Sequence, residues 1–406
     1  MNRQIENKIA KEIIIEFTLK AALPLIIGSG EDEYSDMEII KDNNDINGKP
    51  YIPGTAIAGV MRHYTKNEQV FNENRLSPIY TYDCEITDSP GFKISVRDGV
   101  RLNDNKVAED KAKYDYEIIE AGAEFKVRLD LIIRDKNLEE ASGYPHEKAI
   151  IECAKKFIWG IQKGEIYIGA KSKRGFGRVE IDGPIKVSDE KYFNQYDGKF
   201  EFTPVYDVLE VDLHLTGGIM IRKYNDKPGD ADYIHLKSNG VPVIPGTTWN
   251  GAILHRTEDI FKSIGKYSKD FFEKVFGSKV EKDQGQSSLV IFEESIIEGG
   301  VDLPQTRVKI DRFTGGAVDS ALFTEEPHYI GDTTLVIKYS RGEHYILGLL
   351  LPALEDLCQG YLAVGGETSI GRGIFQGKGI RLNGKALEDK DSYYRKILVE
   401  VDKYVE

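Results

Sequence analysis

One short element occurs twice in the chain, and its spacing constrains the fold more than any other feature. Residues 51–59 read YIPGTAIAG, and residues 243–251 read VIPGTTWNG. The separation between the copies is far longer than a solenoid repeat and close to the length of a whole domain. The sequence therefore predicts two tandem copies of one domain.

Both halves of the chain present the same order of segments. Each half begins with an alternating apolar strand, at 12–30 in the first half and at 206–220 in the second. The repeated element follows, and the residues after it show the apolar spacing of a helix, which Thr55 or Thr247 can cap. A shared order of strand and helix indicates duplication of a domain rather than of a short motif.

The later segments complete the pattern in each half. β-rich segments at 94–119 and 308–330 are typical of polar hairpins, and a long apolar strand, a second helix, a glycine-rich turn and a last strand follow them. This order predicts an α+β fold of two tandem ferredoxin-like domains with inserted β-hairpin lobes. We place the domains at 1–190 and 205–406, because residues 191–204 are polar and interrupted by Gly and Pro, as linkers are.

The composition is that of a folded protein without a membrane span or a disulfide framework. Of the 406 residues, 40% are hydrophobic, and no apolar run approaches the roughly 18 to 20 residues that a spanning helix requires. The first residues lack the apolar stretch and cleavage site of a signal peptide. Cys84, Cys153 and Cys358 are odd in number and far apart, which argues against disulfides and a zinc ribbon. We therefore expect a soluble, cytoplasmic protein.

A net charge of −13 requires any nucleic-acid-binding surface to be local, because phosphate contacts depend on basic side chains. The first glycine-rich turn supplies Lys171, Lys173, Arg174 and Arg178, and the second supplies Arg372. Glycine lets a backbone approach a phosphate closely, and the neighbouring cations suit an anion. We take these five residues as candidate RNA-binding residues. The alternative is that each turn is an ordinary solvated basic turn.

The chain lacks the sequence motifs of the common enzyme classes. It contains no Walker A, H-E-x-x-H or G-x-S-x-G sequence. Gly371 and Gly373 form a GxG, but this pair follows an expected helix and precedes an expected strand, the reverse of the dinucleotide-binding fingerprint. The sequence therefore gives no indication of those nucleotide-binding, zinc-protease or serine-hydrolase chemistries.

The repeated element, the lobe VKIDRFTGGAVDSALF, the segment KVFGS…SSLVIFEES and the loops KSKRGFGRV and GGETSIGRG together resemble the RAMP superfamily of type III CRISPR effector complexes. The likeness is greatest to the backbone subunits of the Csm and Cmr complexes, here fused as a tandem pair. It implies that each domain grips the guide RNA backbone, while the hairpins at 94–119 and 308–330 wedge between bases of the guide–target duplex. The implied partners are guide RNA, target RNA, other RAMP subunits and a large cyclase-like subunit.

The resemblance also implies a metal-dependent endoribonuclease that acts within the assembled complex. The family's catalytic aspartate aligns with Asp36 in the first half and with Asp232 in the second, and each stands five positions before a lysine, Lys41 or Lys237. Each carboxylate would hold Mg²⁺ or another divalent cation, or orient the attacking 2′-hydroxyl. The alternative for Asp36 is a solvated acidic run, since its neighbours are also acidic.

The chain departs from the family pattern inside the repeated helix. Family members carry a lysine there that meets the guide phosphate, whereas this chain has Ala58 and Asn250. Further RNA contacts are therefore assigned to Thr55, Thr247, Asn250, Arg62 and Arg256, although both arginines could equally be solvent-facing. Three other functions stay open: a non-catalytic backbone or capping subunit, a guide-processing endoribonuclease, and an acidic adaptor that binds only protein.

Overall fold

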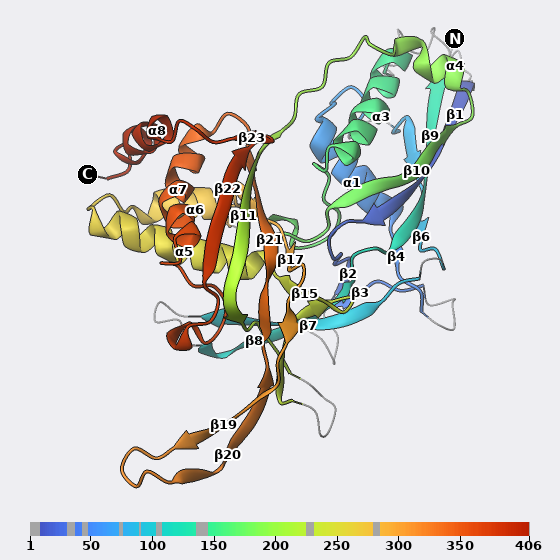
Figure 1. Ribbon diagram of the computed structural model, residues 1–406. Coiled ribbons are helices and arrows are strands. Elements are labelled where there is room, and N and C mark those ends of the chain that lie inside the picture. The colour runs from blue at the N-terminus through green and yellow to red at the C-terminus, as the bar shows by residue number, and fades with distance from the viewer. Residues whose placement is uncertain are drawn as a thin grey trace. The chain divides into compact units, whose positions relative to one another are not determined.

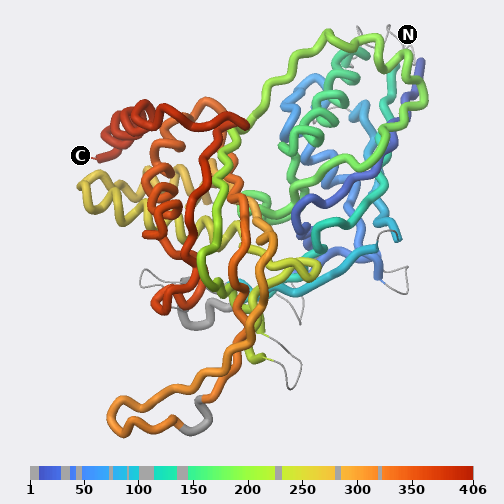
Figure 2. The backbone as a smooth tube through the Cα atoms, viewed as in Figure 1, coloured from blue at the N-terminus to red at the C-terminus, as the bar shows by residue number. Residues whose placement is uncertain are grey.

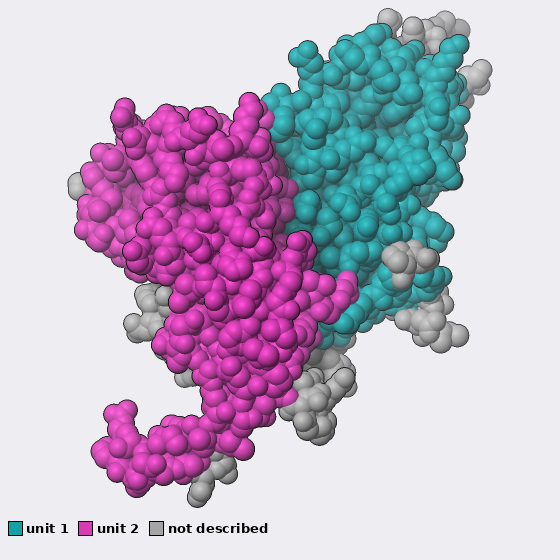
Figure 3. Space-filling view, in the orientation of Figure 1, with its two compact units in different colours: residues 1–172, 176–204 teal, residues 173–175, 205–406 magenta. Residues whose placement is uncertain are grey.

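The computed structural model describes residues 9–30, 37–42, 48–72, 76–88, 91–102, 108–134, 145–224, 231–278 and 285–405. The chain forms two compact units (Figure 3). Unit 1 comprises Met1–Ser172 and Phe176–Pro204, and unit 2 comprises Lys173–Gly175 and Val205–Glu406. Each unit has its own hydrophobic core, so each is described by itself below.

Unit 1 is built on a four-stranded antiparallel sheet in the order β10-β1-β9-β5. Its strands are β1 (Ile9–Ala21), β5 (Ile79–Thr81), β9 (Glu124–Arg134) and β10 (Val179–Val187). Helices α1 (Gly54–Thr65) and α3 (Glu147–Gln162) connect them in the order strand, helix, strand, strand, helix, strand (Figure 1). In order of these four strands the sheet reads 4-1-3-2, which is the ferredoxin-like arrangement predicted from the sequence.

Unit 2 repeats this sheet with the same order and the same directions. Its strands run β16-β21-β11-β22-β23, and β18 also pairs with β21. Their bounds are β11 (Tyr206–Ile219), β16 (Val290–Phe292), β18 (Val301–Asp302), β21 (His328–Ser340), β22 (Phe375–Leu382) and β23 (Lys385–Ala386). The helices are α5 (Gly246–Ser263), α6 (Lys269–Phe276), α7 (His344–Cys358) and α8 (Asp391–Val401). The predicted α+β fold with two tandem ferredoxin-like domains is therefore confirmed.

The cores follow from the apolar periodicities of strand and helix. On β1, Ile13 and Ile15 face the core because alternate strand side chains point to one face of the sheet. On α1, Ile57 and Met61 are buried four residues apart, and on α5 Trp249 and Ile253 repeat that spacing.

The helix that follows the repeated element begins at its glycine, so the predicted threonine caps are wrong. Pro53 and Pro245 occupy the capping positions, neither with a side-chain hydrogen bond, and both threonines lie exposed in the first turn. A Cβ on Gly54 would lie 2.6 Å from the carbonyl oxygen of Thr81, and one on Gly246 would lie 2.0 Å from that of Phe292. The glycine is therefore required because the helix start packs against the second strand of the sheet.

A β-hairpin is inserted before the third sheet strand in each unit. In unit 1 it consists of β7 (Ile94–Leu102) and β8 (Ala108–Ile119). In unit 2 it consists of β19 (Gln305–Ile310) and β20 (Ala317–Glu326), which join β12 (Arg222–Tyr224) and β13 (Tyr233–His235) in a sheet ordered β12-β13-β20-β19. The tip of this second hairpin extends away from the body of unit 2 (Figure 2).

Shorter elements complete the two units. In unit 1 these are β2 (Gly28–Gly30), β3 (Glu38–Ile39), β4 (Tyr51–Ile52), β6 (Cys84–Glu85) and α4 (Glu190–Phe193), with a 3₁₀ turn at Asn194–Tyr196. In unit 2 they are β14 (Lys237–Ser238), β15 (Val241–Ile244) and β17 (Ser295–Ile296), with a 3₁₀ turn at Thr368–Ile370. A further 3₁₀ turn covers Ser172–Arg174. The segment predicted as a linker, 191–204, is grouped with unit 1, and its Phe193 is buried in that core.

Candidate nucleic-acid interface

The glycine-rich loop of unit 1 lies directly against the segment that follows β1. The Gly177 N–H donates to the carbonyl oxygen of Pro24 (2.8 Å), and the Ala170 N–H donates to that of Ile26 (2.7 Å). Gly169 has a φ of +89°, and a Cβ there would lie 2.2 Å from the Ile26 oxygen. These glycines are present because two backbone segments meet without room for a side chain.

The loop of unit 2 repeats these contacts. The Gly373 N–H donates to the Gly218 carbonyl (2.8 Å), and the Gly366 N–H donates to the Met220 carbonyl (2.7 Å). A Cβ on Gly373 would lie 1.9 Å from the carbonyl oxygen of Val364. In the sequence, these glycines indicated the close approach of a phosphate. At these positions the approaching group is the protein's own backbone, and the loop is fixed in place.

The four basic residues predicted in the first loop are divided between the units. In unit 1, the Lys171 ammonium lies 3.4 Å from the ring centroid of Tyr116, and Arg178 forms a β-bridge with Tyr167. In unit 2, Lys173 donates a hydrogen bond to the Tyr206 hydroxyl (3.4 Å). Burial lowers the pKa of Lys173.

The remaining polar candidates from the loop and from the two helices have different surroundings. Arg174 and Arg62 are exposed, as an RNA contact requires. Arg256 instead pairs with Asp356 of α7, its Nε lying 2.7 Å from Oδ2. Asn250 buries its Oδ1 without a hydrogen-bond partner among the described residues.

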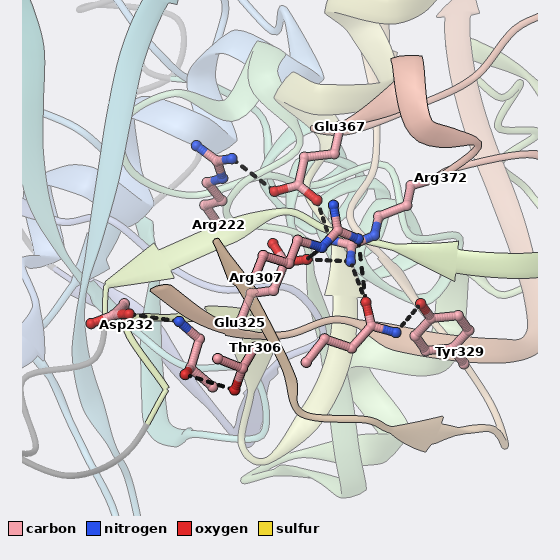
Figure 4. Close-up of polar contacts among 10 residues, drawn as sticks. Arg222, Asp232, Thr306, Arg307, Glu325, Tyr329, Glu367 and Arg372 are labelled. Carbon is pink, nitrogen blue, oxygen red and sulfur yellow. Dashed lines mark hydrogen bonds and ion pairs between the residues drawn. The ribbon is translucent and has the colours of Figure 1, made fainter. Parts of the chain in front are cut away.

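Arg372 does not face solvent, contrary to the predicted RNA contact. Its side chain is 3% exposed, and its guanidinium donates to the carboxylates of Glu325 and Glu367 and to Gln305 Oε1 (3.0 Å) (Figure 4). A guanidinium that two carboxylates already enclose is poorly placed to bind a phosphate, because the negative carboxylates repel the negative phosphate. Arg372 therefore connects parts of unit 2 to one another.

Two further arginines, which the sequence argument missed, extend this network outward. Arg307 Nε lies 2.8 Å from Glu325 Oε1, and Arg222 donates to Glu367 Oε1 at 2.8 Å (Figure 4). Burial alone would raise the pKa of Glu367, but the hydrogen bond from Arg222 and the charge of Arg372 hold that pKa below its usual value. Arg307 and Glu325 lie on adjacent strands of one hairpin, whereas Arg222 and Glu367 are 145 residues apart, so no local sequence pattern links that second pair.

The two predicted catalytic and metal-binding aspartates differ in what the structure says of them. Asp36 lies outside the described residues. Asp232 is exposed beside the hairpin, where its Oδ2 accepts a hydrogen bond from the Thr324 N–H (2.8 Å) and its own N–H donates to the Thr324 carbonyl (2.8 Å). Within the described residues, no group of three or more His, Cys, Asp or Glu side chains could hold a metal. A cation at Asp232 would therefore need further ligands from elsewhere, and phosphate oxygens of RNA have suitable chemistry.

The two lysines that follow the aspartates occupy comparable positions. Lys41 pairs with Glu117 of β8 at 3.0 Å, and Lys237 lies 3.8 Å from Glu326 of β20 and 2.6 Å from Asp302. Each lysine thus joins its segment to the second strand of the local hairpin.

The exposed end of the second hairpin combines apolar and basic side chains. Phe313 is 89% exposed and Leu322 is 68% exposed. The turn is ordered by Asp311, whose Oδ1 accepts hydrogen bonds from the N–H groups of Phe313 (2.9 Å) and Thr314 (2.8 Å). Arg312 stands beside Phe313 in the turn and is also exposed. Because Phe313 and Leu322 are exposed, packing in the core does not explain why these positions are apolar.

A buried histidine at the base of this lobe gives unit 2 a pH-dependent stability. His235 is fully buried, and its Nδ1 accepts a hydrogen bond from the Ile221 N–H (3.2 Å). Burial, with the charge of His328, lowers its pKa from 6.5 to about 3. Between these values the unfolded chain binds a proton that the folded unit does not, so stability falls as the pH falls.

We expect His235→Gln to flatten the pH dependence of unit 2 stability below about pH 6.5, by up to about 1.4 kcal/mol per pH unit. Urea unfolding of unit 2 can be followed by Trp249 fluorescence in a Trp159→Phe background, because these two tryptophans are the only ones in the sequence. Exposed His344, changed to Gln, is the control and should leave the slope unaltered. Equal slopes for wild type and His235→Gln would contradict this assignment.

A family model of known proteins matches the chain twice, once in each half of the internal repeat. The family model described as the RAMP superfamily matches residues 18–180 and again residues 212–376. A search of curated proteins found no match. No helix within the described residues is both long and apolar enough to cross a bilayer. RAMP proteins are CRISPR-associated, and they bind RNA and other RAMP subunits. Since the two matches together cover most of the sequence and coincide with two equivalent sheets, this chain belongs to the RAMP superfamily and carries two tandem RAMP domains.

Proposed function

We propose that this chain is a guide-RNA-binding backbone subunit of a type III CRISPR effector complex, and that its hairpins kink the guide–target duplex. The β19–β20 hairpin carries the proposal, because it presents Phe313 to solvent on an ordered turn. An aromatic ring offers a stacking platform to any base, and a neighbouring cation such as Arg312 suits the phosphate backbone. The hairpin of unit 1, β7–β8, would act in the same way.

We further propose that the subunit cleaves target RNA at the root of the hairpin. The Asp232 carboxylate is exposed there, and the Thr324 N–H fixes one of its oxygens. Asp232 would hold Mg²⁺ or another divalent cation together with RNA oxygens, or orient the attacking 2′-hydroxyl. The cation, when bound, would stabilise negative charge on the phosphate. Asp36 is the proposed counterpart in the first domain, and the other proposed partners are RAMP subunits and a large cyclase-like subunit.

A non-catalytic backbone subunit is the second candidate function, and one contact favours it. The same hydrogen bond that would orient Asp232 also anchors the hairpin strand at Thr324. An aspartate that only anchors the hairpin would shape the RNA without cutting it. The cleaving and the non-catalytic subunit would make the same RNA contacts. They differ in one outcome: removal of the Asp232 charge would abolish target cleavage only in the first.

We expect Phe313→Ala to weaken RNA binding by roughly 5- to 150-fold, since stacking of a base on an aromatic ring contributes about 1–3 kcal/mol. The measurement is fluorescence anisotropy of a labelled guide–target duplex titrated with the complex assembled around each variant. Tyr361→Ala is the matched control, because Tyr361 is an aromatic residue of the same unit that is 73% exposed and lies outside the hairpin.

Unchanged affinity for Phe313→Ala, or an equal loss for Tyr361→Ala, would contradict the role of the hairpin. Salt dependence provides an independent measurement on the wild type. Affinity that falls as salt rises is expected for phosphate contacts, whereas a failure to bind RNA at any salt concentration would favour a protein-binding adaptor.

A further inference from the structure

We propose that the residue between the last two glycines of each loop, Phe176 in unit 1 and Arg372 in unit 2, is a positioning residue that ties the loop to the root of the hairpin. The two residues occupy the same place in the sequence motif, as G-F-G and G-R-G. Each is 3% exposed. A bulky apolar ring and a charged guanidinium are thus buried at equivalent positions, which points to a shared geometric task.

In unit 2 the tie is ionic. Arg372 leaves the loop and reaches both strands of the hairpin, because it donates to Gln305 of β19 and to Glu325 of β20 (Figure 4). Gln305 in turn donates from Nε2 to the Tyr329 hydroxyl at 2.8 Å, which links the hairpin to β21. Glu325 is fully buried, and Arg307 and Arg372 provide the ionic partners beside it.

In unit 1 the tie is apolar. The Phe176 ring meets the Tyr116 ring of β8 edge to face, with centroids 5.8 Å apart. Both belong to a small cluster with Ile26 and Ile118 that is distinct from the main core of the unit. Arg97 of β7 also lies over the Phe176 ring, 5.9 Å from its centroid. Both strands of this hairpin therefore contact the one loop residue, as they do in unit 2.

Each loop can hold its hairpin in place because the loop itself is fixed by backbone hydrogen bonds. The Gly177 N–H donates to Pro24 just after β1, and the Gly373 N–H donates to Gly218 near the end of β11, so the residue before each glycine is held in place. The β19–β20 hairpin, by contrast, has an exposed far end, where Phe313 is 89% exposed. The buried contact of Arg372 at its root adds to the pairing of β20 with β13 and to the Asp232–Thr324 hydrogen bonds, and it makes loop and hairpin act as one body.

If the chain binds RNA as proposed, the contact between loop and hairpin also couples RNA binding at the loop to the order of the hairpin. RNA bound at the loop of one domain would also order the hairpin of that domain, so that the wedge stands at a fixed distance from the backbone contact. The tie itself does not depend on RNA, and it can be tested in the protein alone.

The first experiment measures hydrogen exchange of the full chain by mass spectrometry. Arg372→Met should raise exchange in β19 and β20 by at least about tenfold, while β11 and β21 stay protected. Phe176→Ala should do the same for β7 and β8 alone. Ile370→Ala is the matched control, since Ile370 lies in the same loop and is 51% exposed, and it should change neither hairpin.

A second variant keeps this test decisive if Arg372→Met fails to fold. Arg372→Met combined with Glu325→Leu removes both partners and creates an apolar contact like that of unit 1. We expect it to restore hairpin protection to within about threefold of wild type. Hairpin exchange that matches wild type in Arg372→Met, or that rises equally in every strand of unit 2, would overturn the tie.

The last measurement separates the tie from the proposed function. A single-stranded RNA of mixed sequence should protect both loop 365–373 and hairpin 305–326 in the wild type, but only the loop in Arg372→Met. Equal RNA protection of the hairpin in both proteins would overturn the coupling. An absence of RNA protection in the wild type would count against the proposed function, whereas the tie is judged by the RNA-free exchange.

Discussion

Gly373→Ala is expected to destabilise unit 2 by about 4 kcal/mol or more, a large part of the roughly 5–15 kcal/mol that stabilises a typical domain. Gly373 has a φ of +72°, and an added Cβ would lie 1.9 Å from the carbonyl oxygen of Val364 and 2.8 Å from its carbonyl carbon. Both atoms are backbone, so no side-chain rotation can relieve the contact. Urea unfolding followed by Trp249 fluorescence in the Trp159→Phe background would measure the loss.

Gly371→Ala is the control for this substitution. Gly371 has a φ of +85°, but no heavy atom lies within 4 Å of its added Cβ. It therefore carries the cost of the left-handed conformation alone, about 1–2 kcal/mol. Equal effects at the two positions would mean that backbone strain, rather than close approach of two segments, explains why the loop is rich in glycine.

Asp232→Asn, combined with Asp36→Asn so that neither domain compensates, is expected to reduce divalent-metal-dependent cleavage of target RNA by about 10²- to 10⁴-fold in the assembled complex. The substitution keeps the size of the side chain and an oxygen that can accept from the Thr324 N–H, but it removes the charge that would hold a cation. Cleavage of a labelled target RNA with Mg²⁺, and with EDTA in its place, provides the measurement. Affinity for the target should stay close to that of wild type.

Asp270→Asn is the matched control, because Asp270 is an exposed aspartate of the same unit that lies on α6. It should leave cleavage unchanged. Full activity in Asp232→Asn, tested together with Asp36→Asn so that neither domain compensates, would favour the non-catalytic backbone subunit. Cutting of repeat RNA by the chain alone in EDTA would instead favour a guide-processing endoribonuclease.

The tertiary structure gives the glycine-rich loops a structural role that their sequences do not show. By composition, a loop with Lys171 and Arg174 among glycines is either a candidate phosphate site or an ordinary solvated basic turn. In the structure Gly169 lies against Ile26 in the segment after β1, whereas Gly177 and Gly373 lie against the backbone at the start of their own loops. The loop is thus a structural part of each domain, and only Gly371, with open space around it, retains the room that a phosphate would need.

The sequence by itself determined the duplication, the α+β class and the order of strands and helices. These follow from local physics: alternation along strands such as β1, four-residue spacing on α1 and α5, and Pro-Gly at the helix starts. The 4-1-3-2 sheet then follows from that order, because few topologies connect such elements without crossing. The family match rests on the same repeated pattern.

Only the tertiary structure decided which charges face a ligand and which face each other. Arg372 and Arg256 read as free cations in the sequence, yet Arg372 pairs with Glu325, 47 residues away, as well as with nearby Glu367, and Arg256 pairs with Asp356, 100 residues away. Burial of a charge is set by what packs around it, and that packing joins segments whose local sequences carry no mark of one another. For the same reason Phe176 and Arg372, which differ in every chemical property, perform one task at one place in the fold.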